Sequence, residues 1–234
     1  PTPFPRNYSL ALGASEVTPL DLTRAYGVFA TLGKRFDPIF ITGVTDSSGN
    51  PLEFAGTRPH FVPVVNPATA YVITNMMQSV VKKGTGTGAL ALNRPVAGKT
   101  GTTNDNKDAW FVGFTPDMVT GVWVGYDAEK SLGSYFTGGH AATPIWTEFM
   151  KKALADRPVL DFPIPEGVTL MRVDASTGLR ATGGNSSRME VFVQGTEPAR
   201  FAPRKHTAVA AEDEEGGEND VEPSAHEAEP ENDD

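Results

Sequence analysis

The sequence predicts an α+β fold in which helices flank a mainly antiparallel sheet. Two strand patterns, Ala109–Phe114 and Val119–Gly125, are joined by residues 115–118, whose Thr-Pro-Asp-Met sequence suits a tight turn. A connection this short makes the two strands antiparallel neighbours. Helices are predicted where a capping residue precedes proline, because proline suits the first helical position. The three such places begin at Thr18, Asn66 and Thr143.

The first helical pattern follows Thr18. Apolar residues recur at helical spacing as far as Leu32, and Gly33 is typical of a helix end. Further along, Pro38–Val44 and Pro51–Phe54 flank an Asp-Ser-Ser-Gly-Asn sequence, which predicts a hairpin turn between two strands.

The second helix is predicted from Asn66 to about Val81, with cations in its last turn and Gly84 at its end. The third is predicted to begin with Thr143 as its cap. The expected apolar face of the second helix comprises Ala70, Ile73, Met77 and Val80 or Val81, and that of the third Ile145, Phe149 and Leu154.

Glycine and threonine alternate over Gly84–Gly88, between the second helix and a strand predicted over residues 96–103. Such a composition marks loops in general, so this segment is either a connector or a wall of a ligand cleft. Two further strands, Val168–Asp174 and Met189–Val193, are predicted beyond a proline-rich boundary at residues 158–165.

These patterns divide the chain into three parts. Residues 1–160 form the main unit, residues 161–202 a small C-terminal β appendage, and residues 203–234 a disordered acidic tail. Residues 201–234 contain twelve acidic and two basic residues, whereas residues 1–200 contain seventeen acidic and eighteen basic ones. The net charge of −9 therefore belongs to the tail. The tail either binds a basic partner or simply solvates the C-terminus.

Composition also excludes several kinds of site. There is no cysteine, and the four histidines show no metal-ligand spacing, so we expect neither a metal nor another cofactor. No basic stripe suggests a nucleic-acid partner. No apolar run is long enough to cross a membrane. Because the chain begins without methionine, we expect a piece of a longer protein.

Lys99-Thr100-Gly101, within the sequence V-A-G-K-T-G-T-T, is the strongest candidate for a functional site. Three interpretations compete. A phosphate-binding loop would need glycine at position 93, where the chain has Asn93, and a helix after the Lys-Thr pair, where a strand is predicted. A solvated lysine on an edge strand is the ordinary outcome for an isolated K-T-G. The third interpretation is the active-site strand of a serine acyl-transferase.

The wider sequence favours the third interpretation. The chain resembles the transpeptidase domain of class A, bifunctional penicillin-binding proteins of the 1A type over about residues 8–200. The stretches that carry the resemblance, in order, are residues 11–20 (A-L-G-A-S-E-V-T-P-L), 83–87 (K-G-T-G-T), 97–104 (A-G-K-T-G-T-T-N), 107–113 (K-D-A-W-F-V-G), 120–127 (T-G-V-W-V-G-Y-D), 138–146 (G-G-H-A-A-T-P-I-W) and 195–198 (G-T-E-P).

The resemblance implies a partial β-lactamase/transpeptidase-like fold, with residues 1–160 as the C-terminal part of the transpeptidase domain. It implies a serine that attacks the penultimate D-Ala carbonyl of a peptidoglycan stem peptide, and β-lactams that acylate the same serine. Lys99 would stabilise negative charge near that serine and help relay a proton. Thr100 and Thr102 would bind the terminal carboxylate, and the Thr102 N–H would be part of the oxyanion hole. Gly101 would let the strand approach the nucleophile helix closely, and Thr103 would line the cleft.

The family's other two motifs, S-x-x-K and S-x-N, have formal matches at Ser79–Lys82 and Ser48–Asn50, and we reject both. Ser79 is predicted at a helix C-terminus, whose partial negative charge disfavours an oxyanion. Ser48 is predicted in a hairpin turn, and the two matches occur in the reverse of the family's order. We expect the true motifs upstream of Pro1.

The resemblance also implies a parent protein with a membrane anchor and a glycosyltransferase domain, on the periplasmic side of the bacterial inner membrane. Its expected partners are stem peptides, β-lactam inhibitors and candidate cell-wall synthesis proteins. Two alternatives stay open. One is a D,D-carboxypeptidase or β-lactamase-like hydrolase on the same fold, and the other a non-catalytic module that binds stem peptides. Trp110, Trp123 and Trp146 are predicted to be core residues, and His140 structural or at a rim.

Overall fold

A computed structural model describes residues 4–52, 59–128, 130–182 and 186–204. Its centre is a three-stranded antiparallel sheet in the order β5-β6-β7. The strands are β5 (Ala97–Thr102), β6 (Asp108–Thr115) and β7 (Met118–Gly125). The predicted antiparallel pairing and the tight turn between β6 and β7 are both confirmed, with Thr115 opposite Met118.

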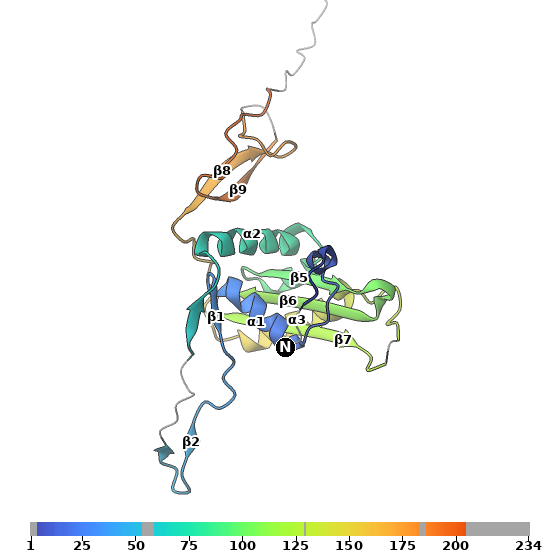
Figure 1. Ribbon diagram of the computed structural model, residues 1–234, viewed down its shortest axis with the longest axis vertical. Helices are drawn as coiled ribbons and strands as arrows, with labels where there is room; N and C mark the ends of the chain where they lie inside the picture. The colour runs from blue at the N-terminus through green and yellow to red at the C-terminus, as the bar shows by residue number, and fades with distance from the viewer. Residues whose placement is uncertain (1–3, 53–58, 129, 183–185, 205–234) are drawn as a thin grey trace, which may run out of the picture.

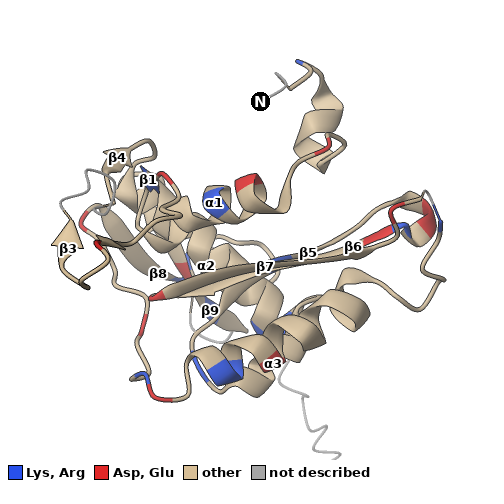
Figure 2. Cartoon of the chain, turned by 90° about the horizontal axis from the view of Figure 1, so that it is seen from below, with Lys and Arg blue, Asp and Glu red and all other residues tan. Residues whose placement is uncertain are grey.

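Three α-helices cover this sheet. They are α1 (Pro19–Ala30), α2 (Pro67–Lys83) and α3 (Thr143–Ala153). Helices α1 and α2 lie on one face of the sheet and α3 lies on the other (Figures 1 and 2). The caps of the first two are as predicted, because the Thr18 hydroxyl accepts from the Asp21 N–H (3.1 Å) and the Asn66 side chain accepts from the Ala68 N–H (2.9 Å).

The start of α3 differs from the prediction. Thr143 is the first residue inside the helix, because a π-helix over Gly138–Ala142 runs directly into α3. The Thr143 hydroxyl donates to the Gly138 carbonyl (3.1 Å) instead of capping an N–H. A chain that enters a helix from another helical segment leaves no extended residue in the capping position.

The predicted face of α3 is also wrong for two of its three residues. Ile145 and Phe149 are each 53% exposed, whereas Trp146 and Met150 are fully buried. Trp146 packs where Gly113 leaves room on β6, since a Cβ atom at Gly113 would lie 2.9 Å from the indole. This fit decides which side of α3 faces the sheet.

A two-stranded ladder that the sequence did not predict joins β1 (Lys34–Phe36) to β4 (Phe61–Pro63). The predicted hairpin lies between them as β2 (Val44–Thr45) and β3 (Pro51–Leu52). Residues 38–43, predicted as strand, are not in a strand, and Phe54 lies outside the described residues. The stretch contains proline and glycine, which disfavour strand pairing.

Side chains of β6 alternate between two hydrophobic clusters, one on each face of the sheet. Phe111 packs edge-to-face on Trp146 of α3, with ring centroids 5.1 Å apart. Phe114 points to the opposite face, where it packs edge-to-face on Phe162 at 5.6 Å. Both phenylalanines are fully buried.

The two predicted C-terminal strands are confirmed as β8 (Val168–Asp174) and β9 (Ser187–Val193), of which β9 begins two residues earlier than predicted. They pair with each other as an antiparallel hairpin. The hairpin lies against α2, on the side away from the central sheet (Figure 1).

The predicted disordered tail lies, from residue 205 on, outside the described residues. The boundaries at residues 160 and 202 stay predictions. Among the described residues, no helix combines the length and the apolar character needed to cross a bilayer, and no cluster of potential metal ligands occurs.

Candidate functional site

A cleft of about 590 Å³ opens beside the C-terminal half of β5. Three segments that are distant in sequence provide its walls: β5 itself, the Gly84–Gly88 segment after α2, and the π-helix with Thr137 before it. The residues that line it are Gly84, Thr85, Thr87, Gly88, Thr100, Thr102, Thr137, Gly139 and His140. Threonine hydroxyls therefore make up most of its polar side-chain surface.

Two hydrogen bonds tie the threonines of β5 to the other walls. The hydroxyl groups of Thr85 and Thr100 lie 2.6 Å apart. The Gly138 N–H donates to the Thr102 hydroxyl oxygen at 3.0 Å. Thr100 and Thr102 point to the same side of β5 because side chains alternate along a strand. Both therefore face the cleft.

The backbone of β5 adds donors along the same edge. In the described sheet β5 has β6 on one side only. The Thr103 N–H donates to the Asp108 carbonyl at 3.1 Å. Because N–H groups alternate between the two edges of a strand in an antiparallel ladder, the N–H of Thr102 points away from β6. No partner for that N–H occurs among the residues that the structure describes, so it can bind an anion at the edge of the sheet.

Lys99, Gly101 and Thr103 do not line this cleft. Lys99 is exposed, and its ammonium group donates to the Thr100 carbonyl at 2.9 Å. Thr103 pairs with Asp108, whose N–H donates to the Thr103 hydroxyl oxygen at 2.8 Å. A Cβ atom at Gly101 would lie 3.2 Å from the Cβ of Trp110, so the close neighbour of this glycine within the chain is β6. Of the five predicted site residues, the structure brings Thr100 and Thr102 together in the cleft.

The sheet carries little charge around this site. Lys99 and Asp108 are the two charged residues of β5, β6 and β7 (Figure 2). Asp108 accepts from the Trp123 indole N–H at 2.8 Å. Asp108 thus has a structural role at the start of β6, since aspartate commonly hydrogen-bonds its neighbours where a turn meets a strand. Lys99 therefore supplies the positive charge at the K-T-G strand.

The π-helix approaches β5 more closely than a side chain would permit. A Cβ atom at Gly138 would stand against the carbonyl oxygens of Trp110 and Gly101. At Gly139, a Cβ atom would lie 2.9 Å from the Thr85 carbonyl oxygen. Because these two consecutive glycines have no side chains, the π-helix can pack between β5 and the Gly84–Gly88 segment. π-Helical turns of this kind are frequent at functional sites.

Several cleft residues were not predicted from the sequence as site residues. The Gly84–Gly88 segment, predicted to be either a connector or a wall of a ligand cleft, is a wall of the cleft. A 3₁₀ helix over Thr87–Leu92 begins within it. Thr137 has no sequence signal that would assign it to a site. His140 lines the cleft, which agrees with a rim position.

The two rejected motif matches lie outside the cleft. Ser79 is near the C-terminal end of α2, where its hydroxyl donates to the Asn75 carbonyl at 3.3 Å. Ser48 is in the turn between β2 and β3, where the Asp46 carboxylate accepts from its N–H at 2.8 Å. Of the three tryptophans, Trp146 is fully buried, whereas Trp123 is 38% exposed and so is not the core residue that was predicted.

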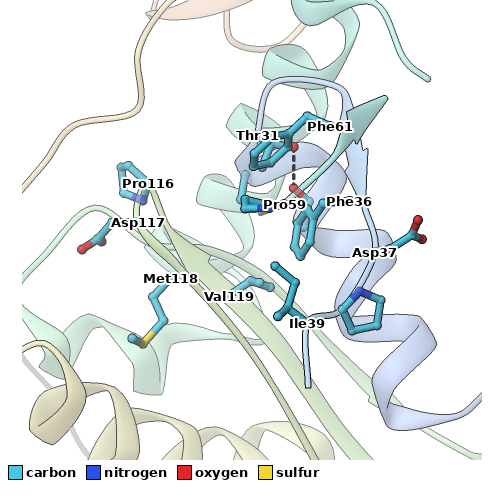
Figure 3. Close-up of a pocket in the computed structure, with 13 residues that line it drawn as sticks. Thr31, Phe36, Asp37, Ile39, Pro59, Phe61, Pro116, Asp117, Met118 and Val119 are labelled. Carbon is cyan, nitrogen blue, oxygen red and sulfur yellow. Dashed lines mark hydrogen bonds between the residues drawn. The ribbon is translucent and has the colours of Figure 1, made fainter. Parts of the chain in front are cut away.

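A second pocket, of about 370 Å³, lies at the opposite end of the sheet, where the β6–β7 turn meets α1, β1 and β4 (Figure 3). Its walls are largely apolar and include Phe36, Phe61 and Val119. The carboxylates at its rim are already paired, Asp37 with Arg24 at 2.7 Å and Asp117 with Arg157 at 3.5 Å. The polar, hydroxyl-rich cleft at β5 is therefore the better candidate for chemistry.

Comparison with known proteins agrees with this choice. A family model described as "Penicillin binding protein transpeptidase domain" matches residues 6–151, which include the whole cleft. A penicillin-binding protein 1A from Aquifex aeolicus is 46% identical over 191 residues, which cover 82% of this chain and 26% of the relative. The chain thus spans about a quarter of the length of the curated relatives it matches.

Solved structures show the same relationship. Penicillin-binding protein 1A from Haemophilus influenzae superimposes with a TM-score of 0.77 at 30% identity, covering 83% of this chain and 34% of that one. The PonA1 protein from Mycobacterium tuberculosis, solved in complex with penicillin V, gives a TM-score of 0.61 at 31% identity, covering 68% of this chain and 44% of that one. By its sequence and by its fold, this chain belongs to the family of penicillin-binding protein transpeptidase domains.

Proposed function

We propose that this chain is part of a D,D-transpeptidase that cross-links peptidoglycan by serine acyl transfer. The observation that carries the proposal is the cleft beside Lys99-Thr100-Gly101, with two threonine hydroxyls facing it and a lysine on the same strand. Membership of the transpeptidase-domain family supports the acyl-transfer chemistry. The whole protein's substrate would be a stem peptide that ends in D-Ala-D-Ala.

Each residue of the motif has a role in this mechanism. Thr100 and Thr102 donate hydrogen bonds to the terminal carboxylate of the acyl donor, or to the equivalent carboxylate of a β-lactam. The outward N–H of Thr102 stabilises the developing oxyanion, a contribution of about 3 kcal/mol for one such donor. The Lys99 ammonium stabilises negative charge near the nucleophile and takes part in proton transfer. Gly101, which has no side chain, lets the nucleophile approach the strand closely. Thr103 follows the motif and is bonded to Asp108 outside the cleft lining.

The nucleophilic serine is proposed to lie in sequence outside this chain. Neither Ser79 nor Ser48 lines the cleft. An acyl-enzyme also needs its serine within reach of the oxyanion donors. The longer protein would carry the membrane anchor and glycosyltransferase domain of class A proteins and would act on the periplasmic side of the inner membrane. β-Lactams are its proposed inhibitors, and cell-wall synthesis proteins its candidate partners.

A first experiment uses the chain alone with a fluorescent penicillin. We expect no covalent labelling, because the proposed nucleophile lies outside this chain. A label that mapped to Ser79 would contradict the proposed assignment of the nucleophile.

A second experiment uses the full-length protein that contains this chain. Substitution of Lys99 by alanine should lower the second-order rate constant of penicillin acylation at least about 100-fold, the usual loss when a transition-state charge partner is removed. Lys152→Ala, at an exposed position near the end of α3, is the matched control and should acylate like the wild type. Equal rates for Lys99→Ala and the wild type would overturn the role of Lys99.

The two alternatives differ in their products. A D,D-carboxypeptidase or β-lactamase-like hydrolase would transfer the acyl group to water, and a binding module would release no D-Ala. Incubation of the full-length protein with a donor stem peptide and an amine acceptor, followed by mass spectrometry, should give the cross-linked peptide and free D-Ala. A hydrolysed donor without the cross-linked product would favour the carboxypeptidase.

A further inference from the structure

His140 lies at the rim of the K-T-G cleft, where three contacts orient its ring. Its ring stacks on Tyr135, with centroids 4.6 Å apart and planes at 6°. Its Nδ1 atom lies 3.1 Å from the Tyr135 carbonyl oxygen and 3.3 Å from the Thr137 hydroxyl. The residue belongs to the π-helix whose first N–H, that of Gly138, is bonded to Thr102. These contacts orient the imidazole on the same wall of the cleft as the Gly138 N–H.

The contacts of Nδ1 determine which ring atom is available to a ligand. Two oxygen atoms of the chain, the Tyr135 carbonyl and the Thr137 hydroxyl, occupy Nδ1, and the Thr137 hydroxyl can donate to it while Nε2 carries the proton. In the part of the chain that the structure describes, Nε2 of His140 has no hydrogen-bond partner. Nε2 is thus the ring atom of this cleft-lining side chain that is left open to a ligand.

The surroundings of His140 favour an anionic ligand. The polar side chains of the described residues that line the cleft are threonine hydroxyls and this one imidazole, and none of them is acidic. Lys99 does not line the cleft, but it gives the strand that carries Thr100 and Thr102 a positive charge and no negative one. A carboxylate accepts several hydrogen bonds at once, and charge-assisted bonds to it are the stronger ones.

We propose that His140 is a further ligand-binding residue of this cleft, whose Nε2 donates to the carboxylate that Thr100 and Thr102 hold. The inference rests on the proposed function, because it assigns a residue to the carboxylate of the same donor. It makes His140 a determinant of preference for ligands that bear this carboxylate.

The test compares benzylpenicillin with its methyl ester, which lacks the carboxylate charge, in the full-length protein. His140→Phe keeps an aromatic ring to stack on Tyr135 and removes both nitrogens. It should lower the second-order acylation rate constant for benzylpenicillin about tenfold, as expected for the loss of one hydrogen bond to a charged group. The rate constant for the methyl ester should change less than about twofold, which also shows that the variant is folded.

Two further variants sharpen the result. His140→Gln places an amide N–H near the position of Nε2 and should recover most of the rate for benzylpenicillin. Tyr135→Phe keeps the ring and the carbonyl group and should behave as the wild type with both ligands. Equal losses for the two ligands in His140→Phe, or no loss for either, would overturn the inference. Acylation of the wild-type protein is measured first. If benzylpenicillin does not acylate it, the proposed function itself is wrong, and this outcome is distinct from a failure of the inference about His140.

Discussion

At the scale of single residues, the contact between Thr85 and Thr100 decides how the cleft presents a hydroxyl donor. The two oxygens lie 2.6 Å apart, so one hydroxyl donates to the other. If Thr100 is to donate its own proton to a carboxylate, it must accept from Thr85. Thr85 is then a positioning residue, since it fixes the rotation of the Thr100 hydroxyl rather than contacting the reacting atoms.

This arrangement gives a prediction for Thr85. Thr85→Val in the full-length protein should lower the rate constant of penicillin acylation about fivefold, because a neutral hydrogen bond contributes about 1 kcal/mol. Thr85→Ser keeps the hydroxyl and should stay within about twofold of the wild type. A serine variant as slow as the valine variant would indicate that the methyl group, and not the hydroxyl, matters at this position.

Single residues also show how far the sequence alone could define the site. Thr100 and Thr102 were predictable because they belong to a recognisable motif on a strand. Thr137 and His140 were not predicted to bind ligand, because their place beside β5 depends on two glycines that admit the π-helix to the strand. No local pattern in the sequence encodes that approach.

At the scale of elements, the turn after β8 shows how one carboxylate organises a hairpin. Asp174 Oδ1 accepts from the N–H and hydroxyl groups of both Ser176 and Thr177, at 2.6 to 3.1 Å. These bonds, chiefly those from the two hydroxyl groups, hold the pKa of Asp174 well below its ordinary value. The ionised form of Asp174 thus stabilises the start of the connection to β9.

The sign of the pH dependence follows from this depressed pKa. The stabilisation by Asp174 is fully present above the ordinary aspartate pKa of about 3.9 and is lost as the pH falls toward the lower pKa of the folded state. Asp174→Asn retains an acceptor oxygen but cannot titrate. Urea unfolding between about pH 5 and pH 3 should therefore show a smaller acid loss in the variant than in the wild type. Identical slopes in the two proteins would contradict the prediction.

Elements were predicted best where local chemistry determines them. The caps at Thr18 and Asn66 and the β6–β7 turn depend on neighbours within four residues, and all three are as expected. The buried face of α3 depends instead on Trp146 fitting over Gly113, which is distant in sequence. The ladder between β1 and β4 brings together segments about 25 residues apart, beyond the reach of periodicity.

At the scale of the whole molecule, Phe162 links the C-terminal part of the chain to the central sheet. Its ring is 8% exposed and packs on Phe114 of β6, in a cluster with Tyr71 of α2. It follows the predicted boundary at residue 160 by two positions. The connection to the β8–β9 hairpin therefore takes part in the core of the preceding unit.

We expect Phe162→Ala to lower the free energy of unfolding by about 3 kcal/mol, the lower part of the range for removing a buried phenylalanine ring. Val159→Ala is the matched control, because Val159 is in the same segment and is 60% exposed. It should change the unfolding free energy by less than about 0.5 kcal/mol. Denaturant titration monitored by tryptophan fluorescence measures both. Equal effects of the two substitutions would show that Phe162 is not part of the core.

The pairing of Phe36 with Phe61 also has a practical use. Strands β1 and β4 pair with each other, and the β2–β3 hairpin lies at a distance from this ladder and from the central sheet (Figure 1). Gly49, in the turn between β2 and β3, has nothing within 4 Å of where a Cβ atom would stand. A fluorophore or affinity tag inserted at this tip would be tethered at a known distance along the chain from β1, and would report on the protein without disturbing the K-T-G cleft.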